Sequence, residues 1–523
     1  MGVFIGIDLG TTSLKIIGIN ESADHLFTES IPNVVITKGR CKELDMAVLW
    51  NSVCTLIKDT ILKHNLQSRN ILAVGICGQG EGLFALDANK KPFQNAILWN
   101  DNRAASLVNS LNEDIKIREK IKNITGSFPF SGATGVLLTY LKTTNPKNYK
   151  NIQYVLFCKD YIRFCLTGKI YTDYTDASTS LLNLKTKNYS EELFSLLGIS
   201  DIIDKLPELK SPFDLGGTVS REAAKLTGLL EGTPVSVGML DLVSAFMGNG
   251  AKNINDVSIT LGTTSSAGII LNNDTSLNTL AGFEMHYIDS KLIEVMATMS
   301  GAGNLNWIKK IFFTDTGCET NIDDKTFFEY LDKNIPLIPP GALGVMYLPF
   351  ISQGGERMPF NNPNARASFV GLSQNVSISV MIRSVMEGVG FSILDCLKHL
   401  SDWDKISQDN KIFLSGGGAS SAVWPQIISD ILGKNIMVID GKAFSARGAA
   451  YSALYCYYKT APDKTNLVDF STFKLFKPNI ENHKLYEKMY NLYYKLRLSQ
   501  AEMWDELKQI RDISKSLITE KEQ

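Results

Sequence analysis

The strongest constraint on how this chain can fold is a five-residue sequence, Leu-Gly-Thr-Thr-Ser, that occurs twice. The copies begin at Leu9 and Leu261, about half a chain apart in 523 residues. Each copy stands between two apolar stretches rich in β-branched residues, a pattern that indicates a strand, a tight turn and a second strand. Because the same hairpin is used in both halves, we expect two similar lobes.

The repeated turn is also suited to holding phosphate. Glycine lets the backbone adopt a positive φ, and the exposed N–H groups and hydroxyls of such a turn can surround an anion. One copy alone is typical of an ordinary hairpin. Two identical copies indicate that each lobe offers a phosphate-binding turn to one shared cleft.

The two copies differ in the residue that precedes them. Asp8 comes before the first copy, whereas Thr260 comes before the second. A carboxylate beside a phosphate is unfavourable unless a cation lies between them. Asp8 therefore predicts a Mg²⁺ ion at the first turn.

Length and composition limit the remaining choices. The chain is too long for one core, and we expect a domain boundary near 250–255 that separates lobes 1–250 and 251–523. With 44% hydrophobic residues, 20% charged residues and a net charge of −1, neither nucleic acid nor an anionic membrane is an expected partner. We find no bilayer-spanning run and no signal peptide. The 8 Cys form no Cys-x-x-Cys pair, which favours buried free thiols in the cytoplasm.

Two stretches of the first lobe could form a sugar site. A buried strand over 71–77 is expected to end in the glycine-rich loop Gln79-Gly80-Glu81-Gly82, because function often lies where a central strand ends. A solvated turn is an equally good interpretation of that loop. Trp99 is followed by several polar residues, and a sugar needs hydrogen bonds together with an apolar platform. Taken alone, Trp99 is more typical of a core aromatic.

Further along, an acid follows a predicted strand over 233–238. Asp241 stands where this strand gives way to a helix of small residues, so it could be a general base or simply a helix N-cap. Before it, a short helix is expected over 159–168, ending at a glycine. Asp173 and Asp176 are expected in the polar loop that follows.

The second lobe contains two more glycine-rich turns. One, at 300–304, precedes a helix predicted from Leu305. The other, at 415–421, lies between a short strand and a helical pattern, where glycines allow a nucleotide to approach and the helix N-terminus favours its phosphates. The charged tail over 485–520 is expected to be a helix on the surface of this lobe, with no catalytic residue.

Together these segments resemble the FGGY carbohydrate kinases, of the superfamily that includes actin and the heat-shock chaperone ATPases. The resemblance extends over nearly the whole chain. The matching segments are 8–13, 96–103, 159–168, 238–248, 261–265, 347–372, 387–388 and 414–424.

This resemblance implies an α/β fold of two RNase H-like lobes that close on ATP-Mg²⁺ and a sugar across an interlobe cleft. Asp241 falls at the catalytic base and Asp8 at the metal-associated acid. Phosphoryl transfer needs mainly positioning, charge neutralisation and such a base. The implied nucleotide site is Thr11, Thr12, Lys15, Gly262, Thr263, Thr264, Asn304, Gly417, Gly418 and Ala419, and the implied sugar site is Gln79, Gly80, Glu81, Trp99 and Asp241.

The chain departs from its relatives at two places. Xylulokinase-like members usually have Gln-Met-His-Gly and glycerol kinases Gln-Arg-Glu where this chain has Gln79 to Gly82. The spacing here is most similar to the L-xylulose (3-keto-L-gulonate) kinases and erythritol kinases. The second departure is Ala443, where many relatives have Glu.

The predicted function is ATP-dependent phosphorylation of a ketopentose such as L-xylulose or D-xylulose. A carboxylate at Glu81 should disfavour anionic sugars. The alternatives are a polyol or sugar acid (erythritol, glycerol, gluconate or 3-keto-L-gulonate), or a nucleotide sensor without a substrate. The polar cluster of Gln79, Glu81, Trp99 and Asp241 argues against a sensor. A homodimer is left open.

Overall fold

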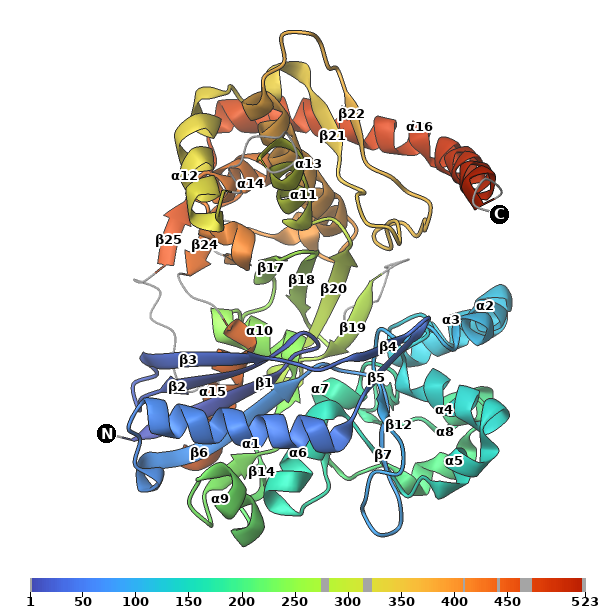
Figure 1. Cartoon of the computed structure of the whole chain (residues 1–523), viewed down its shortest axis with the longest axis vertical. Coiled ribbons are helices and arrows are strands. Elements are labelled where there is room, and N and C mark those ends of the chain that lie inside the picture. Colours follow the sequence, from blue (N-terminus) through green and yellow to red (C-terminus); the bar gives the residue numbers. More distant parts are fainter. Residues whose placement is uncertain are drawn as a thin grey trace.

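A computed structural model describes residues 2–273, 282–313, 322–407, 410–439, 443–460 and 473–519. The chain forms two lobes, each built on one mixed sheet (Figure 1). The N-terminal lobe lies at the bottom of the view and the C-terminal lobe at the top. The expected two-lobed α/β fold is confirmed.

The N-terminal sheet is built around the first repeated hairpin. Strand β1 (Val3–Leu9) pairs antiparallel with β2 (Ser13–Ile19) and parallel with β6 (Ile71–Gly78). Strand β16 (Met239–Leu240) runs parallel to β6 on its other side. The remaining strands of this sheet are β3 (His25–Pro32), β14 (Leu215–Thr218) and β15 (Pro234–Ser236).

Helices cover this sheet and form a smaller layer beside it. Helix α1 (Met46–Lys63) follows Asp45, whose carboxylate caps it by accepting hydrogen bonds from the Ala47 and Val48 N–H groups. The other helices are α2 (Ala105–Glu113), α3 (Ile115–Thr125), α4 (Thr134–Thr144), α5 (Pro146–Asn151), α6 (Cys158–Thr167), α7 (Tyr174–Ala177), α8 (Glu191–Leu196) and α9 (Arg221–Thr227). The short strands are β4 (Ile36–Lys38), β5 (Cys41–Leu44), β7 (Phe84–Leu86), β8 (Ala96–Ile97), β9 (Tyr154–Leu156), β10 (Thr172–Asp173), β11 (Leu182–Asn183), β12 (Asn188–Tyr189) and β13 (Leu209–Lys210).

The C-terminal sheet repeats the arrangement. Strand β17 (Val257–Leu261) pairs antiparallel with β18 (Ser265–Leu271) through the second hairpin, and parallel with β23 (Ile412–Ser415). The other strands are β19 (Phe283–His286), β20 (Leu292–Thr298), β24 (Ile436–Ile439) and β25 (Phe473–Phe476), with β21 (Met346–Leu348) and β22 (Ser368–Val370) in a separate pair. The helices are α11 (Gly303–Phe313), α12 (Asp324–Asn334), α13 (Ile378–Lys398), α14 (Trp424–Leu432) and α16 (Ile480–Thr519).

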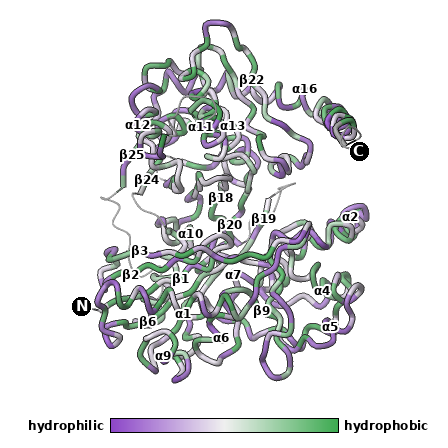
Figure 2. The backbone as a smooth tube through the Cα atoms, in the orientation of Figure 1, coloured by the Kyte–Doolittle hydropathy of each residue, from purple (hydrophilic) through white to green (hydrophobic). Residues whose placement is uncertain are grey.

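The tail helix α16 packs on its own lobe, as predicted. Tyr486, Tyr490, Tyr493 and Trp504 are buried in the core of the C-terminal lobe. The end of α16 projects from the upper lobe and carries both hydrophobic and hydrophilic residues (Figures 1 and 2). Residue 520, the end of the predicted tail, lies outside the described residues.

Two helices lie at the junction of the lobes. Helix α10 (Asp241–Asn249) leads from β16 towards β17, and it packs against α15 (Phe444–Tyr458). Although α15 belongs to the second half of the chain, it packs on β1 and β6 of the first (Figure 1). A Cβ at Gly6 or Gly75 would overlap the backbone of α15. The domain boundary near residue 250 stays a prediction. Helix α15 comes after that boundary in the sequence but packs on the sheet of the first lobe.

The described part contains no helix that is both long and apolar enough to cross a bilayer. Its cysteines are all free, as expected. Five of them are buried, while Cys41 and Cys165 are half-buried. Cys318 lies outside the described residues.

Candidate active site

Strand register brings three separate segments of the first lobe to one sheet edge. Leu9 pairs with Gly78 in the parallel ladder of β1 and β6, and Leu240 pairs with the same Gly78. Parallel strands that end at the same edge of a sheet place the residues that follow them side by side. The first repeated turn, the loop that begins at Gln79, and Asp241 therefore meet at this edge.

A hydrogen-bonded chain links the turn, the loop and the aromatic residue. The Trp99 indole Nε1 donates to Thr11 Oγ1 at 3.0 Å, and Thr11 Oγ1 donates to Gln79 Oε1 at 2.9 Å. Trp99 is half-buried rather than a core residue, and Thr12 is exposed. Gln79 Nε2 is buried and finds no acceptor in the described residues other than the nearby Cys158 thiol. The predicted members Gln79 and Trp99 are thus each hydrogen-bonded to the predicted member Thr11.

Two carboxylates lie close together at the same edge. Asp8 is buried, and its Oδ2 lies 3.8 Å from Lys15 Nζ. Burial raises the pKa of the Asp8 carboxyl, while Lys15 opposes that shift. Burial and the nearby Asp8 charge raise the pKa of the Asp241 carboxyl to about 7. Such a pKa suits a group that must accept a proton near neutrality.

Asp241 is not a helix N-cap. The N-cap of α10 is Leu240, and Asp241 is the first residue inside the helix. Its side chain remains partly exposed, and the Leu242 N–H donates a hydrogen bond to its carboxylate. The N-cap interpretation is therefore wrong, and the general-base interpretation stays a prediction.

The side chains at this edge suit a magnesium ion, but they do not form a complete metal-binding cage. Among the described residues, no group of three or more His, Cys, Asp or Glu side chains could hold a metal. Mg²⁺ is commonly bound by one or two carboxylates, with phosphate oxygens and waters completing its shell. Asp8, beside the first turn and near Asp241, provides such a donor set.

Glu81 has a structural role that the sequence did not suggest. Its Oε2 accepts hydrogen bonds from Thr134 N at 2.8 Å, Thr134 Oγ1 at 3.0 Å and Ser180 Oγ at 2.7 Å. Its Oε1 is buried without a hydrogen bond in the described residues, with the Thr179 hydroxyl near the carboxyl. Burial raises the pKa of Glu81, which weakens the expectation that a full negative charge here repels anionic sugars.

The loop around Glu81 also has an unusual backbone. Glu81 has φ of 58° and Gly82 φ of 75°, so two successive residues lie in the left-handed region. A side chain in this region costs energy and is often found where a site must be shaped. A Cβ at position 80 would overlap Leu240. Because Gly80 has no Cβ, the loop can approach Leu240, the residue before Asp241.

In the second lobe, the repeated turn is held by the loop at 300–304. The Ala302 N–H donates to Gly262 O at 2.7 Å, and the Gly303 N–H donates to Thr263 O at 3.1 Å. A Cβ at Gly301 would lie 2.6 Å from Gly262 O. Helix α11 begins at Gly303, two residues before the predicted start.

Asn304 supports this loop through contacts within its own lobe. Its Nδ2 donates to Gly301 O at 3.1 Å, and its Oδ1 accepts from the Tyr347 hydroxyl at 2.9 Å. Since the side chain is fully buried, any influence on a nucleotide passes through the shape of the loop. Its predicted direct role in the nucleotide site stays a prediction.

The third glycine turn lies next to the second hairpin. Thr260 pairs with Ser415 in the parallel ladder of β17 and β23, so both strands end at the same edge. Gly418 and Ala419 are buried, whereas a Cβ at Gly417 would meet nothing within 4 Å. The predicted nucleotide turn at 415–421 is therefore adjacent to the predicted phosphate turn, with Gly417 on its open side.

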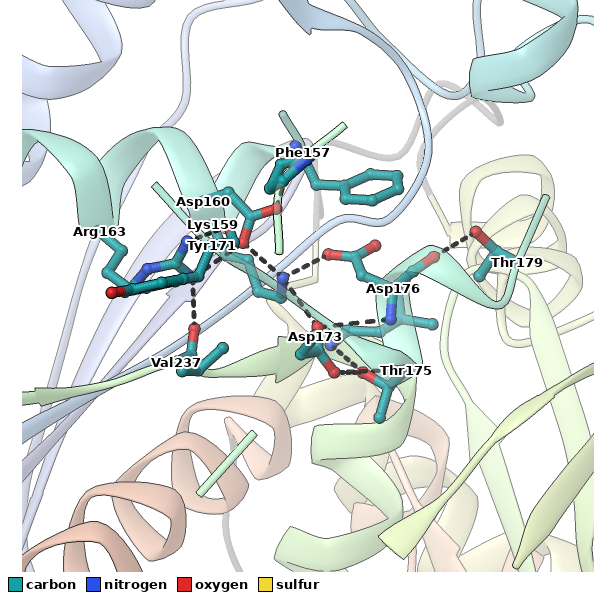
Figure 3. Close-up of polar contacts among 12 residues, drawn as sticks. Phe157, Lys159, Asp160, Arg163, Tyr171, Asp173, Thr175, Asp176, Thr179 and Val237 are labelled. Carbon is teal, nitrogen blue, oxygen red and sulfur yellow. Dashed lines mark hydrogen bonds and ion pairs between the residues drawn. The ribbon is translucent and has the colours of Figure 1, made fainter. Parts of the chain in front are cut away.

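The polar loop predicted around Asp173 and Asp176 is wrong. Asp173 caps the short helix α7, accepting hydrogen bonds from Thr175 N and Asp176 N, and it is fully buried. Lys159 ion-pairs with both aspartates (Figure 3). The sequence offered no local signal for this cluster, because its charges are separated by up to 17 residues and no apolar period marks their burial.

Family profiles match most of the chain. The N-terminal domain of the FGGY family of carbohydrate kinases matches residues 3–248, and the C-terminal domain matches residues 257–457. A probable L-xylulose kinase of Haemophilus influenzae is 29% identical over 499 residues, covering 95% of this chain and 98% of that protein. An erythritol kinase of Brucella abortus is 27% identical, covering 97% and 98%.

A solved structure shows the same fold. Ligand-bound xylulose kinase from Lactobacillus acidophilus matches with a TM-score of 0.84 at 24% identity, covering 97% of this chain and 100% of that one. The profile matches, which span far more than half of the chain, decide the family. The chain therefore belongs to the FGGY family of carbohydrate kinases, and it is a carbohydrate kinase.

Proposed function

We propose that this kinase transfers the γ-phosphoryl group of ATP to a terminal hydroxyl of a small sugar, with a ketopentose such as L-xylulose or D-xylulose as acceptor. The observation that carries the proposal is the position of Asp241. It stands where three parallel strand ends meet, beside the first phosphate turn and near a second carboxylate. Its pKa of about 7 allows it to take a proton at physiological pH.

In the proposed reaction, Asp241 removes the proton of the acceptor hydroxyl as the hydroxyl oxygen attacks the γ-phosphorus. The bond to the bridging oxygen breaks, and ADP leaves with that electron pair. Backbone N–H groups of the Gly10 and Gly262 turns would hold the phosphates from both lobes. A bound Mg²⁺ near Asp8 would neutralise phosphate charge. Lys15, ion-paired with Asp8, is proposed to orient that carboxylate and to contribute positive charge.

The acceptor site is proposed to lie along Gln79, Glu81 and Trp99. The buried Gln79 Nε2 and Glu81 Oε1 lack conventional hydrogen bonds in the described residues, and a buried polar group without a partner is costly. A sugar hydroxyl can donate to one and accept from the other. The Trp99 ring, held by its bond to Thr11, provides a platform for the C–H face.

A substrate panel tests the acceptor class. ADP release, measured with a coupled assay, should be fastest with L-xylulose or D-xylulose, and slower with erythritol, glycerol, gluconate and 3-keto-L-gulonate. Turnover of sugar acids alone would contradict the ketopentose assignment. ATP consumption that no acceptor stimulates would instead support the nucleotide sensor, which family membership argues against.

The role of Asp241 needs its own test. Asp241→Asn should lower kcat by about 10²–10⁴-fold, because general-base catalysis is worth about that much. Nucleotide binding should be retained. A kcat within about twofold of that of the parent enzyme would be a far smaller loss than general-base catalysis predicts, and it would remove the base assignment.

Two further parts of the proposal concern the setting of the enzyme. The free cysteines of the described part and the use of ATP support a cytoplasmic location. A homodimer is proposed as the assembly, and sedimentation of the purified full chain would decide it.

A further inference from the structure

A fully buried charge cluster lies next to the proposed site, and the mechanism does not use it. Lys159 Nζ contacts Asp160 Oδ1 at 2.8 Å, Asp173 Oδ1 at 2.8 Å and Asp176 Oδ2 at 3.1 Å (Figure 3). Arg163 Nη1 lies 2.9 Å from Asp160 Oδ1. None of these side chains is exposed to solvent.

Stability alone is a weak reason for such a cluster. Removing charges from water costs several kcal/mol per ion, and well-packed apolar residues often replace a buried ion pair without loss. Burial raises the pKa of Asp176, while the charge of Lys159 opposes that shift. Lys159 contacts all three aspartates, so its ammonium group fixes their relative positions.

One contact leads from the cluster towards Asp241. The Thr175 hydroxyl donates to Asp173 Oδ2 at 2.5 Å, and the Leu240 N–H donates to the same hydroxyl at 3.0 Å. A hydroxyl has a single proton. Because Asp173 takes that proton, the lone pairs of Thr175 Oγ1 are left to accept from Leu240. Lys159, in turn, holds Asp173 from its other oxygen.

Leu240 is the residue immediately before Asp241 and the N-cap of α10. The side chain of Leu240 makes no capping hydrogen bond. The Leu240 backbone is held by the hydrogen bond that its N–H donates to Thr175 and by its pairing with Gly78 in the sheet. Gly80 of the proposed sugar-site loop lies against Leu240, so close that an added Cβ would overlap the Leu240 side chain. The start of α10 is thus held between the buried cluster and that loop.

We propose that Thr175 is a positioning residue for Asp241, anchored through Asp173 on Lys159. This inference rests on the proposed role of Asp241 as the base. Thr175 touches neither substrate in this scheme. It sets the direction of the helix start, and so the place of the carboxylate that faces the acceptor hydroxyl.

Three variants of Thr175 separate positioning from folding. Thr175→Val keeps the shape but removes the hydroxyl, and we expect kcat to fall about tenfold, the worth of one hydrogen bond in the transition state. The KM for ATP should stay within about twofold, as the nucleotide contacts are unchanged. Thr175→Ser keeps the hydroxyl and should restore kcat. Thermal unfolding shows whether each variant is folded, and Thr175→Ala replaces the valine variant should that one unfold.

Thr227 provides a matched control in the same lobe. Its buried hydroxyl donates to a backbone carbonyl, Ala223 O at 2.7 Å, and accepts from a backbone N–H, that of Leu229 at 3.2 Å. It lies at the end of α9, away from the strand ends that carry the site. Thr227→Val should lower the melting temperature while leaving kcat unchanged.

A double mutant distinguishes the outcomes. If Thr175 acts through Asp241, adding Thr175→Val to Asp241→Asn should change the residual rate by less than about twofold, because the two effects are not additive. If Asp241→Asn abolishes transfer but a folded Thr175→Val or Thr175→Ala retains parental kcat, the positioning role is wrong and the base assignment stands. If Asp241→Asn stays active, the base assignment fails, and the positioning of that base fails with it.

Discussion

Replacing Asp241 by Asn should make the protein more stable as it makes the enzyme inactive. In the fold, burial and the Asp8 charge raise the pKa of Asp241 from 3.8 to about 7. The unfolded chain therefore releases this proton at a lower pH than the folded chain does. Between pH 4 and pH 7, stability falls with rising pH at this position, and above pH 7 the full cost is present.

The size of the effect follows from the shift. A difference of about three pKa units corresponds to about 4 kcal/mol at 1.36 kcal/mol per unit, and we expect about 2–4 kcal/mol because the side chain is partly exposed. Asparagine carries no charge, so this cost disappears. For a chain of this length, the entropy of unfolding is on the order of 1 kcal/mol/K, which converts the gain into about 2–4 °C if the chain unfolds as one unit.

The assay is thermal unfolding of the parent and Asp241→Asn proteins between pH 4 and pH 8.5. The variant should match the parent near pH 4 and exceed it increasingly up to pH 7, then keep a constant advantage. Asp323→Asn is a control of opposite sign, because its hydrogen bonds to Thr326 lower the pKa of Asp323, and this variant should be less stable at high pH. Equal melting temperatures for Asp241→Asn and parent at pH 8 would refute the argument that the ionised Asp241 carboxylate destabilises the fold.

Three further predictions concern activity. First, kcat/KM should fall about tenfold per pH unit below pH 7 as Asp241 becomes protonated, and a profile flat down to pH 5.5 would contradict this. Second, Gly301→Ala, whose Cβ would lie 2.6 Å from Gly262 O, should displace the second phosphate turn and raise the KM for ATP, measured by initial rates, while the sugar KM changes less. Third, Glu81→Gln keeps one oxygen that can accept from Thr134. It replaces the other oxygen, which is unpartnered in the described part of the chain, by an NH2 group that cannot accept from a sugar hydroxyl. It should raise the sugar KM more than the ATP KM; equal increases would indicate a general loss of structure.

Several features of the site follow from the order of residues along the chain. The repeated hairpins, the buried strand ending at Gly78 and the helix capped by Asp45 all obey local rules of periodicity and capping. Asp241 is indicated in the same way, as an acid between a strand and a helix. These signals lie within a few residues of one another, and a sequence displays such neighbours directly.

The contacts that shape the site could not be predicted in this way. The Leu240 N–H and the Thr175 hydroxyl are 65 residues apart, and Glu81 binds Thr134 and Ser180, 53 and 99 residues further on. Nothing local distinguishes these polar residues from a solvated loop.

The sequence by itself determined that two similar lobes would carry the same Gly-Thr-Thr hairpin turn, because a turn is specified by its own glycine and hydroxyl residues. Only the tertiary structure decided that Lys159 and its aspartates are buried and linked through Thr175 to Leu240. Only the tertiary structure placed α15 on the sheet of the N-terminal lobe. Burial of a charge depends on partners brought together by the whole fold, and the packing of a helix depends on which sheet leaves room for it.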